Sequence, residues 1–113
     1  MPNNSGTAGV DPRALNIAGS TQPELFDGTV QAIRQQLRNH PAAFWQQALS
    51  QDGPIEIWEI HGRRYLCNGN HRWFAALEEG VTIPVDNIRI IDKTGSQIPT
   101  WQLNQMTRLP GTK

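Results

Sequence analysis

One short stretch decides the predicted fold: RRYLCNGNHR, residues 63–72. Residues 63–67 have the composition of a β-strand, and Asn68-Gly69-Asn70 supplies residue types that favour a turn and cap a helix. Residues 71–79 then carry large apolar side chains on one side and end before Gly80, as a short helix does. The stretch therefore predicts a strand that leads through a tight turn directly into a helix.

The segments before this stretch predict two helices and a hairpin. Apolar residues recur at helical spacing over residues 29–39, and residues 42–49 predict a second, shorter helix. Residues 55–60 combine isoleucines with a tryptophan, so they predict a strand that pairs with residues 63–67 around the His61-Gly62 turn.

The remaining segments predict shorter elements. Residues 10–17 predict an extended edge strand, because Pro12 disfavours a helical conformation at the residue before it. Residues 81–91 predict a final strand, whose start Pro84 confines to an edge. Residues 101–106 predict one helical turn.

The order of these elements indicates one α/β or α+β domain, and 113 residues suffice for a single hydrophobic core. We expect this domain to span residues 11–108. Residues 1–10 are expected to form a flexible N-terminal tail or linker, and residues 109–113 a C-terminal tail.

Composition narrows the class of protein. Ten basic and ten acidic residues give a formal net charge of zero, so binding to nucleic acid or a membrane through a global charge field is not expected. The single cysteine, Cys67, excludes an internal disulfide, and no cysteine–histidine spacing matches a zinc site. A secretory signal and a membrane span are also not expected. These features suit a protein that folds in a reducing compartment, and a domain cut from a larger exported chain would share them.

Positive charge is nevertheless concentrated in one place. Residues 61–72 contain three arginines, two histidines and no acidic residue. At a strand-to-helix turn, free backbone N–H groups and the helix dipole attract an anionic oxygen. Gly69 allows a close approach of the backbone, and Arg72 can bind a phosphate through two N–H groups. The pattern predicts a phosphate site; the alternative is an ordinary turn whose arginines are solvated.

Residues 65–80, YLCNGNHRWFAALEEG, resemble the signature of the ParB/sulfiredoxin superfamily. In that signature a strand leads into a Gly-x-[His/Arg]-Arg turn and then into a helix with paired alanines. The resemblance extends over about residues 10–91, where the other segments follow in the family's order. It implies a small domain with a mixed sheet and a strand-turn-helix phosphate site, whose phosphate contacts fall on Gly69, His71 and Arg72.

Two departures from the family pattern narrow down which members of the superfamily this sequence resembles. Sulfiredoxins carry their reactive cysteine immediately before the His-Arg pair, where this chain has Asn70, so sulfinic-acid reduction is not expected. Chromosome-partitioning proteins add a DNA-reading domain and a dimerisation segment, for which this chain has no room. The sequence most resembles the compact ParB-like nuclease or toxin domains of bacterial polymorphic toxins.

The resemblance implies a nuclease-type bacterial toxin domain that cleaves phosphodiester bonds of nucleic acid in a target cell. It also implies secretion as part of a larger toxin, activity in the target-cell cytoplasm and a cognate immunity protein, with no membrane partner. One alternative is a nucleotide-binding enzyme that hydrolyses ATP or transfers its phosphoryl group at the same site. Another is a non-catalytic module that binds nucleic acid. These alternatives allow for Mg²⁺ as a cofactor and for ATP or another nucleotide as a ligand.

His71 and Arg72 are the central predicted catalytic residues. An imidazole titrates near neutrality, so His71 is a candidate general base for an attacking water or a donor to the developing phosphorane. Arg72 would stabilise negative charge on the phosphate. Glu56, Glu59 and Asp27 are further candidates, because carboxylates bind divalent ions and activate water in such sites; solvated carboxylates are the alternative.

Substrate binding is assigned to residues on both sides of the turn. They are Asn68, Gly69, Asn70, Arg63 and Arg64. Successive side chains of a strand point to opposite faces, so we expect only one of Arg63 and Arg64 to reach the substrate. The four tryptophans are available either to stack on bases or to pack the core.

Overall fold

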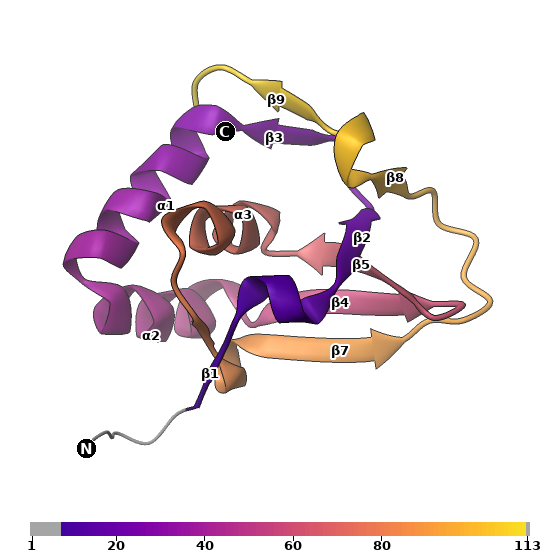
Figure 1. Cartoon of the computed structure of the whole chain (residues 1–113), viewed down its shortest axis with the longest axis horizontal. Coiled ribbons are helices and arrows are strands. Elements are labelled where there is room, and N and C mark those ends of the chain that lie inside the picture. Colours follow the sequence, from indigo (N-terminus) through magenta and orange to yellow (C-terminus); the bar gives the residue numbers. More distant parts are fainter. Residues whose placement is uncertain (1–7, 113) are drawn as a thin grey trace.

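A mixed five-stranded sheet organises the chain (Figure 1). The computed structural model describes residues 8–112. The strands lie in the order β7-β4-β5-β2-β8, and their bounds are Ile88–Asp92, Ile55–Ile60, Arg63–Asn68, Ile17–Ser20 and Trp101–Gln102. β4 and β5 form the predicted antiparallel hairpin, whereas β7 runs parallel to β4 and β2 runs parallel to β5.

Three α-helices accompany the sheet within the described part of the chain: α1 (Asp27–Asn39), α2 (Pro41–Asp52) and α3 (Asn70–Glu79). Pro41 starts α2, because proline suits the first position of a helix. Gly80, in a left-handed conformation, ends α3. The coarse prediction of an α/β domain is confirmed. No helix in residues 8–112 has the length and apolar character needed to cross a membrane.

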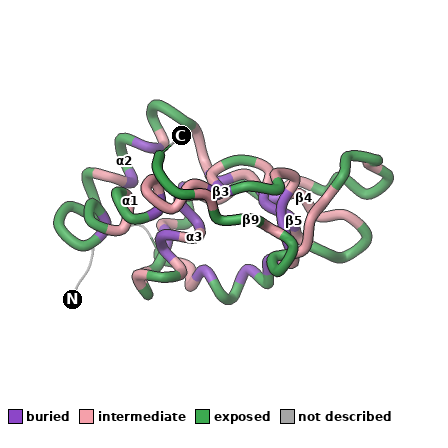
Figure 2. Tube along the Cα trace, turned by 90° about the horizontal axis from the view of Figure 1, so that it is seen from above, coloured by how far each residue is buried: buried purple, intermediate pink, exposed green. Residues whose placement is uncertain are grey.

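The hydrophobic core lies between the helices and one face of the sheet. Val30 of α1, Trp45 of α2 and Trp73 of α3 pack in one cluster with Ile57 and Leu66 of the hairpin. Figure 2 shows buried segments in the helices and in the β4–β5 hairpin. The core therefore fixes the helices relative to the end of β5, where the predicted site lies.

The prediction of an edge strand over residues 10–17 is wrong for most of its length. Pro12–Leu15 forms a 3₁₀ helix, and strand β2 begins only at Ile17. The Asp11 carboxylate accepts a hydrogen bond of 2.9 Å from the backbone N–H of Arg13 and so caps this helix. Aspartate followed by proline at the first position is a helix start, and this local preference outweighs the extended one.

The ends of the predicted domain also differ in detail. Of the predicted N-terminal tail, residues 1–7 lie outside the described residues, whereas Gly9–Val10 forms strand β1 and pairs with β6 (Ile83–Pro84). The predicted strand over residues 81–91 is divided into β6 and β7 by a 3₁₀ turn at Val85–Asn87.

The C-terminal segment returns to the body of the domain. Leu103–Gln105 forms the helical turn predicted there. β9 (Thr107–Leu109) then runs parallel to β3 (Glu24–Phe26), a pairing that the sequence pattern does not predict. Beyond it, Gly28 donates a backbone hydrogen bond of 2.7 Å to the Gly111 carbonyl, so the predicted tail crosses the first turn of α1.

A network of ion pairs joins α1, α3 and β9 on the surface. Its pairs are Arg34 with Glu78 and Glu79, Arg38 with Glu79, and Arg108 with Glu78 and Asp27. Glu79 has the least exposed side chain of the network, at 14%, and its carboxylate receives hydrogen bonds from two arginines. The hydrogen bonds from Arg38 and then from Arg34 lower the pKa of Glu79 to about 2.

This low pKa predicts an acid-sensitive contribution to stability. Because the folded-state pKa lies below the unfolded value, the contribution is complete above about pH 4.5 and is lost as the pH falls towards about 2. Glu79→Gln should therefore lower the free energy of unfolding near neutral pH and flatten its decline over this acid range. Urea denaturation as a function of pH measures both effects. Asp86→Asn, a change at an exposed carboxylate with no ion pair among residues 8–112, is the control, and identical pH profiles for Glu79→Gln and the parent would contradict the prediction.

Candidate phosphate-binding groove

The junction between β5 and α3 depends on Gly69. Its φ is 82° and its ψ is 27°, a left-handed conformation that disfavours residues with a Cβ atom. A Cβ atom at this position would lie 2.9 Å from Nη2 of Arg72 and 2.9 Å from Cγ1 of Ile55. Glycine is therefore required both for the turn and for the space that the Arg72 guanidinium occupies.

Arg72 folds back over this turn into the protein. Only 6% of the residue is exposed, and Nη1 donates a hydrogen bond of 2.8 Å to the carbonyl oxygen of Gly53. Within residues 8–112 it has no other hydrogen bond or ion pair from its side chain. Burial lowers the pKa of Arg72 and the nearby Asp52 carboxylate opposes this shift, but a guanidinium remains protonated in proteins. A buried cation with most of its donors unused thus lies at the start of α3.

A groove of about 360 Å³, which we call the Arg72 groove, opens beside this cation. The start of α3, the end of α2 and the first half of α1 meet here. The lining residues are Gln22, Thr29, Ile33, Phe44, Asp52 and the five residues 68–72. Asp52 is the acidic residue of this lining.

Asn68 and Asn70, two of the predicted binding residues, hold the groove together. Asn68 donates from Nδ2 to the carbonyl oxygens of Asp52 and Pro54, at 3.2 and 3.4 Å, and so ties the end of β5 to the loop before β4. Asn70 is 2% exposed; its Oδ1 accepts from Ser20 Oγ, and its Nδ2 donates to Gln22 Oε1 at 2.7 Å. The amide of Asn70 is therefore a structural link to β2 and fixes the orientation of Gln22.

His71 lies half-buried at the edge of the groove. Its Nε2 accepts a hydrogen bond of 3.0 Å from the backbone N–H of Phe26, and the two rings stack with centroids 6.3 Å apart. Accepting this bond requires Nε2 to be unprotonated, so the proton of the neutral ring lies on Nδ1. A general base needs an available lone pair, and that of Nε2 is already used. This geometry favours a positioning role for His71, which joins α3 to the start of α1; its predicted role as a donor stays a prediction.

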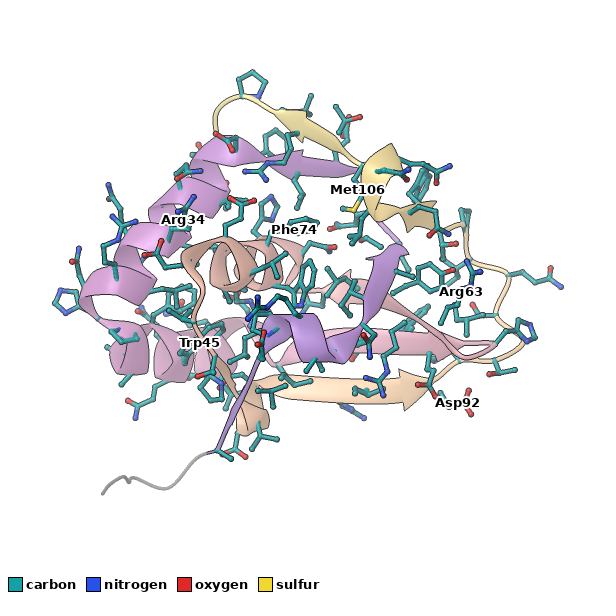
Figure 3. The ribbon with its side chains drawn as sticks, in the orientation of Figure 1. Arg34, Trp45, Arg63, Phe74, Asp92 and Met106 are labelled. Atoms are coloured by element: carbon teal, nitrogen blue, oxygen red, sulfur yellow. The ribbon has the colours of Figure 1, made fainter. Side chains whose placement is uncertain are left out.

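The two arginines of the hairpin and Glu59 lie at the far end of the sheet. Arg63 is exposed and points away from the helices, as Figure 3 shows, whereas Arg64 pairs with Glu59 at 3.1 Å and donates to the Leu15 carbonyl. Asn68 lies five residue steps along the strand from Arg63, a distance of about 16 Å. Arg63, Arg64 and Glu59 are therefore not brought to the groove, because the strand carries them away from its carboxyl end.

The other predicted carboxylates are also engaged elsewhere. Glu56 alternates with the core residues Ile55 and Ile57, so it lies on the opposite face of the sheet, where it accepts a hydrogen bond of 2.9 Å from Trp58 Nε1. Asp27 pairs with Arg108. Neither carboxylate lines the Arg72 groove.

Five lining residues were not predicted: Gln22, Thr29, Ile33, Phe44 and Asp52. A signal for Asp52 was present, because in an antiparallel hairpin the residues before β4 must lie beside those after β5. Thr29 and Ile33 belong to the predicted amphipathic helix, but its partner surface is a tertiary feature. Within residues 8–112 there is no group of three or more His, Cys, Asp and Glu side chains that could hold a metal ion. A metal here would depend on Asp52 and on oxygens of the substrate.

Comparison with known proteins adds no family. No family model matches the chain, and no curated protein matches its sequence. The resemblance to the ParB/sulfiredoxin superfamily therefore stays a prediction, and the geometry of the Arg72 groove carries the functional argument.

The role of Gly69 is tested by paired alanine substitutions at the two ends of α3. Gly80 has a similar left-handed conformation, with φ 72° and ψ 32°, but a Cβ atom added there would meet no other atom within 4 Å. Gly80→Ala should destabilise by about 1 to 2 kcal/mol, the cost of this backbone for an L-residue. Gly69→Ala should destabilise more, because its Cβ also displaces Arg72. Chemical denaturation measures the difference, and equal losses would contradict the proposed packing of Arg72 over Gly69.

Proposed function

We propose that the Arg72 groove binds a phosphate group of nucleic acid and that the protein is a nuclease-type toxin domain, which hydrolyses phosphodiester bonds. The observation that carries the proposal is the buried Arg72 guanidinium, whose side chain has one carbonyl partner and no ion pair within residues 8–112. A buried cation with unused donors is costly. The nearby Asp52 carboxylate offsets part of its charge but forms no ion pair with it among residues 8–112, and a phosphate would supply the missing acceptors and further negative charge.

The chemistry of the groove suits phosphate better than other anions. A guanidinium presents N–H groups in a fork that matches two phosphate oxygens. The groove also contains the first residues of α3, where backbone N–H groups without helical partners favour negative charge. The resemblance of residues 65–80 to a phosphate-binding family supports the same assignment.

Hydrolysis would use Arg72 and Asp52 in different roles. The oxygen of a water molecule forms a bond to phosphorus, and the ester bond to the leaving sugar oxygen breaks with its electron pair. Arg72 stabilises the charge that develops on the non-bridging oxygens. Asp52 accepts a proton from the attacking water, and the leaving oxygen takes a proton from solvent. A magnesium ion, if bound by Asp52 and the substrate phosphate, would add further neutralisation of charge.

One observation favours a nucleotide enzyme as the second candidate. Ile33 and Phe44 supply an apolar part of the same groove, and such a surface suits the base of a nucleotide whose phosphates lie at Arg72. ATP hydrolysis or phosphoryl transfer would then replace phosphodiester cleavage. Binding of nucleic acid without turnover is the outcome expected of a non-catalytic module.

The cellular setting is proposed from the resemblance alone. A domain of this type would be secreted as part of a larger bacterial toxin, act in the cytoplasm of a target cell and be neutralised in the producing cell by a cognate immunity protein.

The activity is tested with plasmid DNA, total RNA and ATP as substrates, each with and without Mg²⁺. Arg72→Lys keeps the positive charge but loses the fork of donors, so the rate of cleavage should fall by about 100-fold. Asp52→Asn should also lower the rate, because it removes the proposed base.

Arg63→Lys is the matched control, since Arg63 is an exposed arginine outside the groove, and it should cleave at the parental rate. Melting temperatures verify that each variant folds. If ATP is consumed while the polynucleotides stay intact, the proposed nuclease activity is wrong and the second candidate, a nucleotide enzyme, takes its place. Polynucleotide cleavage that survives both groove substitutions would show that the catalytic site lies elsewhere.

A further inference from the structure

A second hollow shares His71 with the Arg72 groove. It has a volume of about 340 Å³, close to that of the first, and is lined by Gln22, Pro23, Glu24, Phe26 and His71. Gln22 and His71 line both spaces, so these two side chains form the wall between them. We name this space the Phe26 hollow. Two adjoining spaces of similar volume suit a ligand made of two linked units, with one unit in each space.

Both side chains of the shared wall are fixed in place. His71 is held by the hydrogen bond from Phe26 N–H to its Nε2. Gln22 is held twice: its Oε1 accepts from the buried Asn70, and its backbone N–H donates to Ser20 Oγ at 2.9 Å. Because Oε1 is turned towards Asn70, the Nε2 amide group of Gln22 points elsewhere. No residue in 8–112 accepts a hydrogen bond from it. Gln22 lines both spaces, so we take this amide group as a source of two N–H donors there, and such donors suit a phosphate oxygen.

The Phe26 hollow differs in charge from the Arg72 groove. Glu24 is exposed in its lining, whereas Arg72 supplies the cation of the first space. The Arg72 groove also contains a carboxylate, that of Asp52, but the Arg72 guanidinium offsets its charge. No lysine or arginine is among the described residues that line the Phe26 hollow, so repulsion by Glu24 makes this second space unsuited to a phosphate group. Pro23 and the half-buried ring of Phe26 are instead suited to the sugar and base of a nucleoside, because every base has a face that stacks on an aromatic ring.

From these observations we infer that the substrate is a nucleic-acid strand of at least two nucleotides rather than a free nucleotide. One nucleoside lies in the Arg72 groove, the next lies in the Phe26 hollow, and the phosphodiester between them lies where the two spaces adjoin, bound by Arg72 and by the Gln22 amide group. This inference rests on the proposed function, because it assigns the substrate class of the same phosphate site. A free nucleotide would leave the Phe26 hollow empty.

The test compares ligands of increasing length in magnesium-free buffer at fixed low salt. A nucleoside 5′-monophosphate, a dinucleotide and a tetranucleotide are titrated into the protein, and their dissociation constants are measured by calorimetry. The dinucleotide should bind about tenfold more tightly than the monophosphate, because it adds one stacked nucleoside. Phe26→Ala should remove this gain and leave the affinity for the monophosphate unchanged.

Glu24→Gln provides a second variant that does not depend on the packing of Phe26. It removes an exposed negative charge, so it should tighten the dinucleotide by about threefold and leave the monophosphate within experimental error. Asp86→Asn, an equal charge change on the 3₁₀ turn before β7, is its control and should alter neither affinity.

The outcomes separate this inference from the proposed function. Equal, Arg72-dependent binding of all three ligands would overturn the inference and leave the phosphate site standing. A length-dependent gain that persists in Phe26→Ala and does not respond to Glu24→Gln would also overturn it, since the additional nucleoside would then lie elsewhere. Failure of all three ligands to bind would overturn the proposed function itself.

Discussion

The left-handed backbone of Gly69 and the guanidinium that packs over it are the contact on which the site depends. Because Gly69 has no side chain, β5 can turn directly into α3 and Arg72 can fold back to the Gly53 carbonyl. The same turn sets the direction of α3, whose Trp73 joins the hydrophobic core. Stability and site geometry are thus coupled through one residue. Arg72 itself remains a buried cation whose side chain has one carbonyl partner in residues 8–112, an arrangement that stabilises the protein little until an anion is present.

Local sequence is enough to predict the hairpin and all three helices, because helical spacing of apolar residues, strand-favouring composition and turn or cap residues are all signals within a single segment. The short strands depend on partners far along the chain. Ser20 of β2 pairs with Trp101 of β8, and Glu24 of β3 pairs with Thr107 of β9. A Cβ atom at Gly19 would lie 1.8 Å from the Trp101 carbonyl oxygen, so β8 approaches β2 only because a glycine is there. Such constraints exist only in the folded chain, and strands of two to four residues are too short to show a periodicity of their own.

The residues of the candidate site also fall into two groups: those that local sequence predicts and those that only the folded chain brings together. The turn at 68–72 could be predicted, because its residue types indicate both a turn conformation and a local positive charge. The hairpin arginines could not be excluded from composition alone, although strand geometry carries Arg63 about 16 Å from the turn. Asp52 and Gln22 reach the groove through the hairpin register and through the link from Asn70 to β2. The sequence predicts His71 as a base or a donor, but it does not show that the backbone N–H of Phe26, distant in sequence, donates to its Nε2.

The central claim is that Arg72, held over Gly69, is the phosphate-binding group. Nuclear magnetic resonance of protein labelled with ¹⁵N, titrated with a nucleoside monophosphate, tests it most directly. We predict that the guanidinium Nε–H of Arg72 and the backbone amides of Gly69 and Asn70 shift together and saturate with one dissociation constant. If those signals stay unchanged while the exposed guanidinium of Arg63 or Arg89 shifts, the phosphate binds elsewhere and the claim is wrong.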